Sequence, residues 1–149
     1  MLCALALAVM ILLAGCSEFG ELLRGDEIPK DDIFKIVLEN RETILADISS
    51  EDFENALAIE GIKEISPAEY FGDGVYDFYC GGSGFASNTS YCGFYYVGDR
   101  DASCLYDKDG YKKTVDGNII TWRQSDPGGD NEFVLEKICD GFWYYHLKY

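Results

Sequence analysis

Residues 74–80, GVYDFYC, and residues 91–97, YCGFYYV, decide the fold, because aromatic and other apolar side chains dominate both segments. Runs of this composition are typical of β-strands. Side chains two residues apart share one face of a strand. In the first segment Val75, Asp77 and Tyr79 are therefore expected to oppose Tyr76, Phe78 and Cys80. In the second, Tyr91 and Tyr95 are expected to oppose Cys92, Phe94 and Tyr96.

Further segments have the same strand character, namely 62–66, 102–106, 111–115, 119–123, 132–139 and 142–148. Asp-Gly pairs at 109–110, 116–117 and 140–141 are typical of tight turns, since glycine tolerates positive φ and aspartate bonds to its own backbone. Connections this short join antiparallel neighbours, whereas parallel strands need long crossovers. The pattern predicts an antiparallel meander.

Upstream of the strands, apolar residues recur at helical spacing over residues 31–48. Asp31 or Asp32 is the expected N-cap. Ser49 and Ser50 offer a cap for a short second helix that follows. The predicted fold class is α+β, with an N-terminal helix packed on one face of the antiparallel sheet.

Length and charge exclude several classes of protein. A chain of 149 residues fits one domain. Its 27 acidic residues against 12 Lys and Arg give a net charge of −15, which opposes binding to nucleic acid. A hydrophobic fraction of 48% is too high for a disordered acidic chain. The composition therefore indicates a folded acidic domain.

The first residues look like a targeting signal. The uncharged stretch 2–14, LCALALAVMILLA, is too short to cross a bilayer but suits a signal-peptide core. The quartet that ends it, residues 13–16 (LAGC), resembles the lipobox of bacterial lipoproteins. This resemblance implies that Cys16 is diacylated, that residues 1–15 are removed, and that the protein is anchored outside the cytoplasm by its lipid. Met1 is followed directly by an apolar residue instead of a basic region, which suggests an upstream start. The alternative is a buried helix of a cytosolic protein.

Two parts follow the predicted cleavage site. Residues 16–29 mix charge, glycine and proline without a sustained period, which predicts a flexible tether. Residues 30–149 are expected to form the single domain.

The most distinctive segments are 77–85 (DFYCGGSGF), 91–96 (YCGFYY), 136–140 (EKICD) and 142–145 (FWYY). Together they resemble a family of small, uncharacterised lipoproteins of Gram-positive anaerobes, over roughly residues 30–149. The resemblance implies export and a shared fold. It implies no activity.

A binding surface is expected on the aromatic strands and on the glycine-rich segment 81–90, GGSGFASNTS, which is predicted to be a loop. Successive glycine amides can form a nest for an anion, although a plain hairpin loop explains the segment better, since no helix start or lysine follows. Tyrosine is also simply a good strand former. The candidate residues for a protein or glycan partner are Tyr79, Gly81, Gly82, Ser83, Gly84, Phe85, Tyr95 and Tyr144.

Four cysteines remain besides Cys16: Cys80, Cys92, Cys104 and Cys139. They allow three disulfide pairings. If Cys80 lies directly opposite Cys92, these two are expected to pair, which leaves Cys104 with Cys139. Reduced buried thiols are the alternative.

No complete catalytic or metal motif is present. A zinc site is not expected, because the sequence contains no C-x-x-C pair. A calcium site is not expected either, because the acidic residues near 99–116 do not have the spacing of a calcium-binding loop. His146 is the only histidine, and strand parity groups it with Phe142 and Tyr144, which is typical of a structural role. Asp77, between two aromatic residues, is the acid most expected to have a shifted pKa, although a structural carboxylate with satisfied hydrogen bonds is the favoured interpretation of this residue. The sequence predicts no cofactor.

These observations favour a lipid-anchored, exported binding module over an enzyme. The alternatives are a cell-wall or glycan hydrolase that uses two acidic residues, and a structural component of the envelope.

Overall fold

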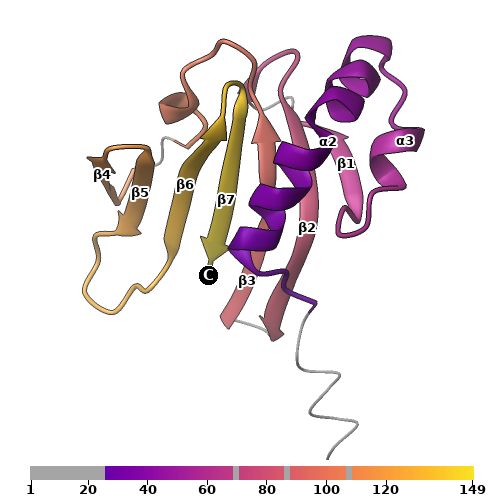
Figure 1. Cartoon of the computed structure of the whole chain (residues 1–149). Coiled ribbons are helices and arrows are strands. Elements are labelled where there is room, and N and C mark those ends of the chain that lie inside the picture. The colour runs from indigo at the N-terminus through magenta and orange to yellow at the C-terminus, as the bar shows by residue number, and fades with distance from the viewer. Residues whose placement is uncertain (1–25, 69–70, 86–87, 107–108) are drawn as a thin grey trace, which may run out of the picture.

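The computed structural model describes residues 26–68, 71–85, 88–106 and 109–149. The predicted signal peptide, Cys16 and most of the predicted tether lie outside the described residues. Two α-helices are followed by strands and one short 3-10 helix (Figure 1): α2 (Lys30–Ser50), α3 (Glu54–Leu57), β1 (Glu64–Pro67), β2 (Tyr76–Phe85), β3 (Asn88–Tyr96), η2 (Ala102–Cys104), β4 (Tyr111–Asp116), β5 (Ile119–Gln124), β6 (Glu132–Cys139) and β7 (Phe142–Lys148).

The strands form one antiparallel sheet in the order β1-β2-β3-β7-β6-β5-β4. The predicted α+β class is confirmed, but the prediction of a single meander is wrong. Two meanders, β1 to β3 and β4 to β7, meet where β3 pairs with β7. The connection from β3 to β4 spans residues 97–110 instead of a tight hairpin, so β4 is free to start at the far edge of the sheet.

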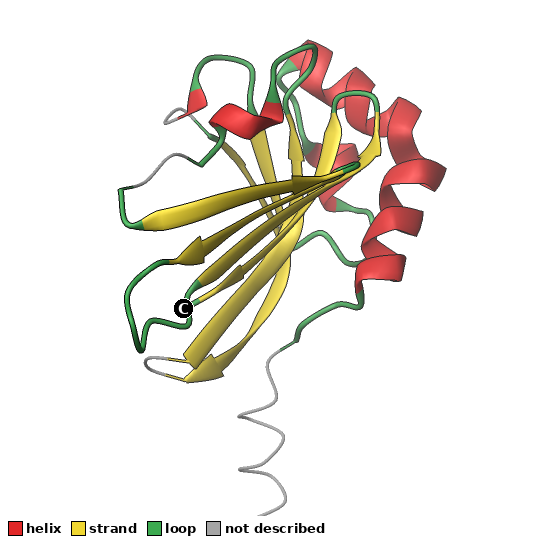
Figure 2. Cartoon of the chain, turned by 90° about the vertical axis from the view of Figure 1, so that its left-hand side faces the viewer, coloured by secondary structure: helices red, strands yellow, loops and turns green. Residues whose placement is uncertain are grey.

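Helix α2 packs on one face of the sheet, and Figure 2 shows α2 and α3 together on that side. Ile33, Val37 and Ile44 are fully buried there. They contact a cluster that includes Phe78 and Phe94, whose rings stack with centroids 4.5 Å apart. Burial of this apolar stripe, at about 25 cal/mol per Å², holds the helix on the sheet.

The helix ends differ from the predicted caps. Pro29 is the N-cap of α2, and Asp31 and Asp32 lie in the first turn instead, where the helix dipole favours negative charge. The hydroxyls of Ser49 and Ser50 donate back to carbonyls of α2 and do not cap α3. These capping predictions were wrong because the helix already begins at Lys30, before either aspartate, and because the serines bond within their own helix.

A buried carboxylate holds α3 against α2. Asp47 accepts hydrogen bonds from the backbone N–H of Ala56 at 2.7 Å and from the Asn55 amide at 3.0 Å. Helix α3 has only four residues, so it depends on such tertiary contacts for its stability.

The opposite face of the sheet carries a second core, built around Tyr95, Trp122 and Leu135. Residues of the 97–106 segment cover part of it, with Ala102 and Leu105 buried. A strand at 102–106 was predicted, but the structure has η2 there. Asp101 explains the difference, since its carboxylate accepts from the backbone N–H of Ser103 and so stabilises a helical turn.

The glycine-rich segment is mainly strand. β2 continues to Phe85 and β3 begins at Asn88, so the predicted loop over 81–90 was wrong. The register between the strands shifts between Tyr79 and Gly81, which is a β-bulge. The remaining strand positions agree with the predictions within a few residues. The Asp-Gly turns are also present, as Gly110, Gly117 and Gly141 have positive φ.

Candidate functional site: a groove around Asp77

The sheet face opposite the helices carries an open groove of about 370 Å³. It lies over β1, β2, β3 and β7, beside the second core. Its lining combines acidic, hydroxyl and aromatic side chains, namely Glu64, Ser66, Asp77, Tyr79, Tyr91, Tyr145 and Leu147. The strand register explains the assembly, because Glu64 is opposite Tyr79 and Ser66 is opposite Asp77, so all four share one face.

Asp77 is the most unusual group in the groove. Its Oδ1 atom is buried and has no hydrogen-bond partner among the described residues. Burial raises the pKa of Asp77 to about 6, and the charge of Glu64 adds to the rise, while hydrogen bonding from Tyr145 opposes it. The predicted perturbation of Asp77 is therefore confirmed. A buried acceptor without a donor is costly in a folded protein, and such a group points to a role.

Tyr145 reaches Asp77 across an intervening strand. The two residues lie on β7 and β2, and β3 separates these strands. Gly93 of β3 is opposite both Tyr79 and Tyr145. A Cβ at Gly93 would lie 2.8 Å from the Tyr145 hydroxyl oxygen. The missing side chain of Gly93 therefore opens the path along which the phenol extends toward β2.

Tyrosine rings form one wall of the groove. The ring centroids of Tyr79 and Tyr91 are 6.3 Å apart, and those of Tyr91 and Tyr149 are 6.1 Å apart. Tyr91 is 40% exposed. This wall offers ligands apolar ring surface together with hydroxyl groups.

Only some of the predicted binding residues reach this site. Tyr79 lines the groove. Tyr95 is buried in the second core, and Tyr144 is buried on the helix side. The side chain of Phe85 lies outside what the structure describes. The predicted set thus does not form one accessible face, because strand alternation sends its members to opposite sides and the two cores cover Tyr95 and Tyr144.

The chain's own residues 26–28 occupy the surface near the predicted glycine site. A Cβ at Gly81 would lie 2.0 Å from the backbone oxygen of Asp26. Glu27 accepts hydrogen bonds from Ser83 at 2.7 Å and from Ser90 at 3.0 Å. These glycine and serine residues therefore hold an N-terminal strap, defined as residues 26–28. They do not surround an open anion site.

The strap also involves the only histidine. His146 Nε2 lies 3.1 Å from Glu27 Oε1. The pKa of Glu27 is lowered, mainly by the hydrogen bond from Ser83 and further by the hydrogen bond from Ser90 and the contact with His146. Burial raises this pKa but does not outweigh the three contacts together. Asp26 contributes an ion pair with Lys63 at 3.2 Å. The last residues of the predicted tether thus lie against the sheet.

A Cys–His catalytic pair is not supported. Cys92 is opposite His146 in the register of β3 and β7. The Cys92 thiol is nevertheless buried, its Sγ lies 3.8 Å from the Ile28 carbonyl oxygen, and burial raises its pKa. A nucleophilic cysteine needs a lowered pKa. His146 is directed to Glu27 instead.

The condition for the predicted disulfide is not met. The bulge places Gly81, not Cys80, opposite Cys92. Cys80, Cys92 and Cys139 are thiols in this structure. Burial raises the pKa of Cys80 to about 12. Because Cys139 is a free thiol here, the pairing expected for it with Cys104, whose own side chain lies outside what is described, is not formed in this structure.

Sequence reasoning missed most of the groove. Glu64, Ser66 and Leu147 were not selected, because their place depends on which strands pair. Tyr91 was visible through parity with Tyr95 but was not chosen. Tyr145 was recognised only as part of an aromatic run.

In the described parts of the chain, no group of three or more His, Cys, Asp or Glu side chains is arranged to hold a metal ion. No helix there is long and apolar enough to cross a membrane.

No known family model matches this chain, and neither curated proteins nor solved structures gave a match.

Proposed function

We propose that this chain is a lipid-anchored, exported binding protein that holds a neutral, hydroxyl-rich ligand such as a glycan in the Asp77 groove. One observation carries the proposal. The buried Asp77 Oδ1 has no donor within the described part of the chain, and Asp77 lines an open groove beside the exposed ring of Tyr91.

The chemistry of the groove favours a neutral ligand with hydroxyl groups. A hydroxyl donor satisfies Asp77 Oδ1 and removes the cost of an unpaired buried acceptor. An anion is disfavoured by Glu64 and by the net charge of −15.

The tyrosines supply the second half of the recognition. Tyr79 and Tyr91 present ring surface next to the acceptor. A sugar ring has apolar C–H faces and polar edges, so it can pack on such rings while its hydroxyls bond to Asp77 and Ser66. The groove is open to solvent, which suits a segment of a longer chain.

Binding is tested on a glycan array with the purified mature protein in a non-ionic detergent. The exchanges Asp77→Asn and Tyr91→Ala are each expected to weaken binding at least tenfold. Val115→Ala serves as the control, because Val115 is 64% exposed on β4 and lies away from the groove. An array without signal, or loss of binding in the control alone, contradicts the proposal. If the protein captures a surface protein and no glycan, the proposed ligand is replaced by a protein partner.

The lipid anchor is tested separately. Residues 13–16 support acylation of Cys16, and two acyl chains anchor a protein stably. Labelling of cells with a palmitate analogue is expected to tag the native chain but not the Cys16→Ala variant. Cys3→Ala is the matched control, since Cys3 lies within the leader. Undiminished label in Cys16→Ala excludes this anchor.

A second candidate function is glycan hydrolysis, which one observation favours. Asp77 and Glu64 share the groove, and the charge of Glu64 contributes to the raised pKa of Asp77. Glycosidases use a protonated acid and an ionised carboxylate in this way. Under this alternative Glu64→Gln abolishes product release while binding persists. If the groove binds glycans and no product is released, hydrolysis is excluded and the binding function is retained.

A further inference from the structure

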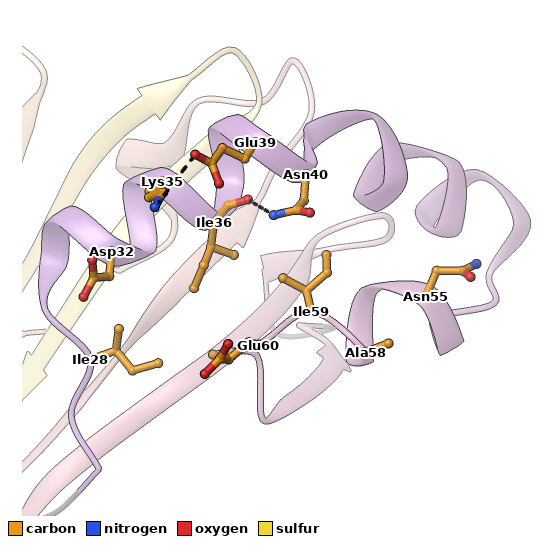
Figure 3. Close-up of a pocket in the computed structure, with 11 residues that line it drawn as sticks. Ile28, Asp32, Lys35, Ile36, Glu39, Asn40, Asn55, Ala58, Ile59 and Glu60 are labelled. Carbon is orange, nitrogen blue, oxygen red and sulfur yellow. Dashed lines mark hydrogen bonds and ion pairs between the residues drawn. The ribbon is translucent and has the colours of Figure 1, made fainter.

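A second cavity, of about 600 Å³, lies on the helix side of the molecule. It is formed by the first half of α2, by α3 with the turn after it, and by Ile28 of the strap. Figure 3 shows these side chains gathered around a common space. The cavity is separate from the Asp77 groove, which lies on the other face of the sheet.

The floor of this cavity is aliphatic. Ile28, Ile36 and Ile59 line it from three different parts of the chain (Figure 3). Gly61 allows their close approach, because a Cβ there would lie 2.6 Å from Cδ1 of Ile36 and 3.1 Å from Cδ1 of Ile28. Gly61 also has φ of +100°, a backbone conformation that other residues rarely adopt. The floor therefore offers apolar surface to a hydrocarbon chain.

The rim of the cavity is acidic and only partly neutralised. Lys35 pairs with Glu39 at 4.0 Å. Asp32, on α2, and Glu60, after α3, line the cavity without an ion-pair partner among the described residues. Figure 3 shows both carboxylates close to Ile28 in this view, Asp32 on α2 and Glu60 on the segment after α3. The lining thus combines negative charge with an aliphatic surface.

We propose that this cavity binds a small aliphatic amine, whose hydrocarbon chain lies on the isoleucines and whose ammonium groups pair with Asp32 and Glu60. The volume is in the range of sites for small molecules. An ammonium ion is the complement of unpaired carboxylates. An anion is opposed by the rim, and a neutral alkane derivative leaves both carboxylates without a partner. A linear diamine carries one ammonium group for each of the two carboxylates.

The probe is 1,6-diaminohexane, titrated calorimetrically into the mature protein in a non-ionic detergent. We expect it to bind more tightly than hexylamine, and hexylamine to bind more tightly than hexan-1-ol. Hexanoate is expected not to bind. Because exposed charges contribute, affinity is expected to fall several-fold when salt is raised from 0.05 M to 0.5 M.

Charge-neutral variants identify the site. Asp32→Asn and Glu60→Gln are each expected to weaken diamine binding three- to tenfold. Asp31→Asn and Glu42→Gln are the matched controls, since both residues are exposed on α2 and neither lines the cavity. Asp77→Asn is expected to leave diamine binding unchanged, which separates this site from the proposed glycan groove. No diamine binding at millimolar concentration, equal binding of hexan-1-ol, or equal losses in the controls overturns the proposal.

Discussion

The side chains of Tyr145 and Asp77 interact across β3, a strand on which neither residue lies. The Tyr145 phenol extends from β7 over Gly93 of β3 toward the carboxyl group of Asp77 on β2. The ring of Tyr145 packs on that of Tyr95, with centroids 4.6 Å apart. Proximity to the Asp77 charge adds to the effect of burial, and both raise the pKa of Tyr145. This contact links the second core to the groove.

Gly93→Ala tests the open path over β3. The added Cβ would lie 2.2 Å from the Phe78 carbonyl oxygen and 2.8 Å from the Tyr145 hydroxyl. We expect the free energy of unfolding to fall by about 1–3 kcal/mol, as for other overpacked sites. Urea denaturation measures the change. A fully stable variant with unchanged Asp77 titration contradicts the role given to Gly93.

Tyr145→Phe tests the interaction between the phenol and Asp77. The phenol opposes the rise that burial imposes on the pKa of Asp77. Its removal is therefore expected to move the pKa of Asp77 above about 6. NMR titration of the Asp77 carboxyl carbon measures this shift. Tyr91→Phe, on the exposed wall of the groove, is the control and should leave the pKa in place.

Asp77→Asn tests the linkage between this carboxyl group and stability. The folded protein holds the proton up to pH about 6, whereas the usual value is 3.8. Between these pH values the folded state binds more protons than the unfolded state, so native stability falls as pH rises. The variant lacks this loss, and its stability relative to the native protein should grow by up to about 3 kcal/mol from pH 4 to pH 7.

Denaturation at several pH values measures this difference. Asp116→Asn, on the exposed strand β4, is the control. A variant whose relative stability does not change with pH would show that Asp77 titrates near its ordinary pKa in the folded protein.

Glu27→Gln tests the N-terminal strap. The lowered pKa of Glu27 means that its ionised form stabilises the fold above the unfolded pKa, and this contribution is lost as pH falls through the folded value. The variant should loosen residues 26–28 at neutral pH, with a cost of about 1 kcal/mol or less because Glu27 is partly exposed.

Cys92 reports on the strap, since its thiol contacts the Ile28 carbonyl. We expect faster alkylation of Cys92 in Glu27→Gln, measured by peptide mass spectrometry. Asp140→Asn is the control, because Lys137 lowers the pKa of Asp140 in a distant turn. Equal alkylation rates in native and Glu27→Gln protein would mean that the strap does not protect the thiol.

Local patterns in the sequence were enough for much of the fold. Alternation assigned the faces of β2 and β3, and helical spacing located α2, because both depend on neighbours within a few residues. The strand predicted at 102–106 was wrong because a hydrogen bond from the backbone N–H of Ser103 to the Asp101 side chain outweighed the strand propensity of the segment. The glycine run at 81–84 was misread for a different reason. Its glycines admit the strap and the neighbouring strand, and close packing of this kind involves residues far apart in the chain.

The sequence by itself determined the acidic character, the α+β class and the alternation of the strands, since each follows from composition or from adjacent residues. It singled out Asp77, but the groups that shift its pKa come from burial and from other strands. Only the tertiary structure decided that β3 pairs with β7. That pairing brings Tyr145 over Gly93 to Asp77, while the pairing of β1 with β2 and of β2 with β3 places Glu64 and Tyr91 in the same groove. The physical reason is that strand order depends on long-range burial of two apolar faces, and no local pattern specifies which distant strand will cover them.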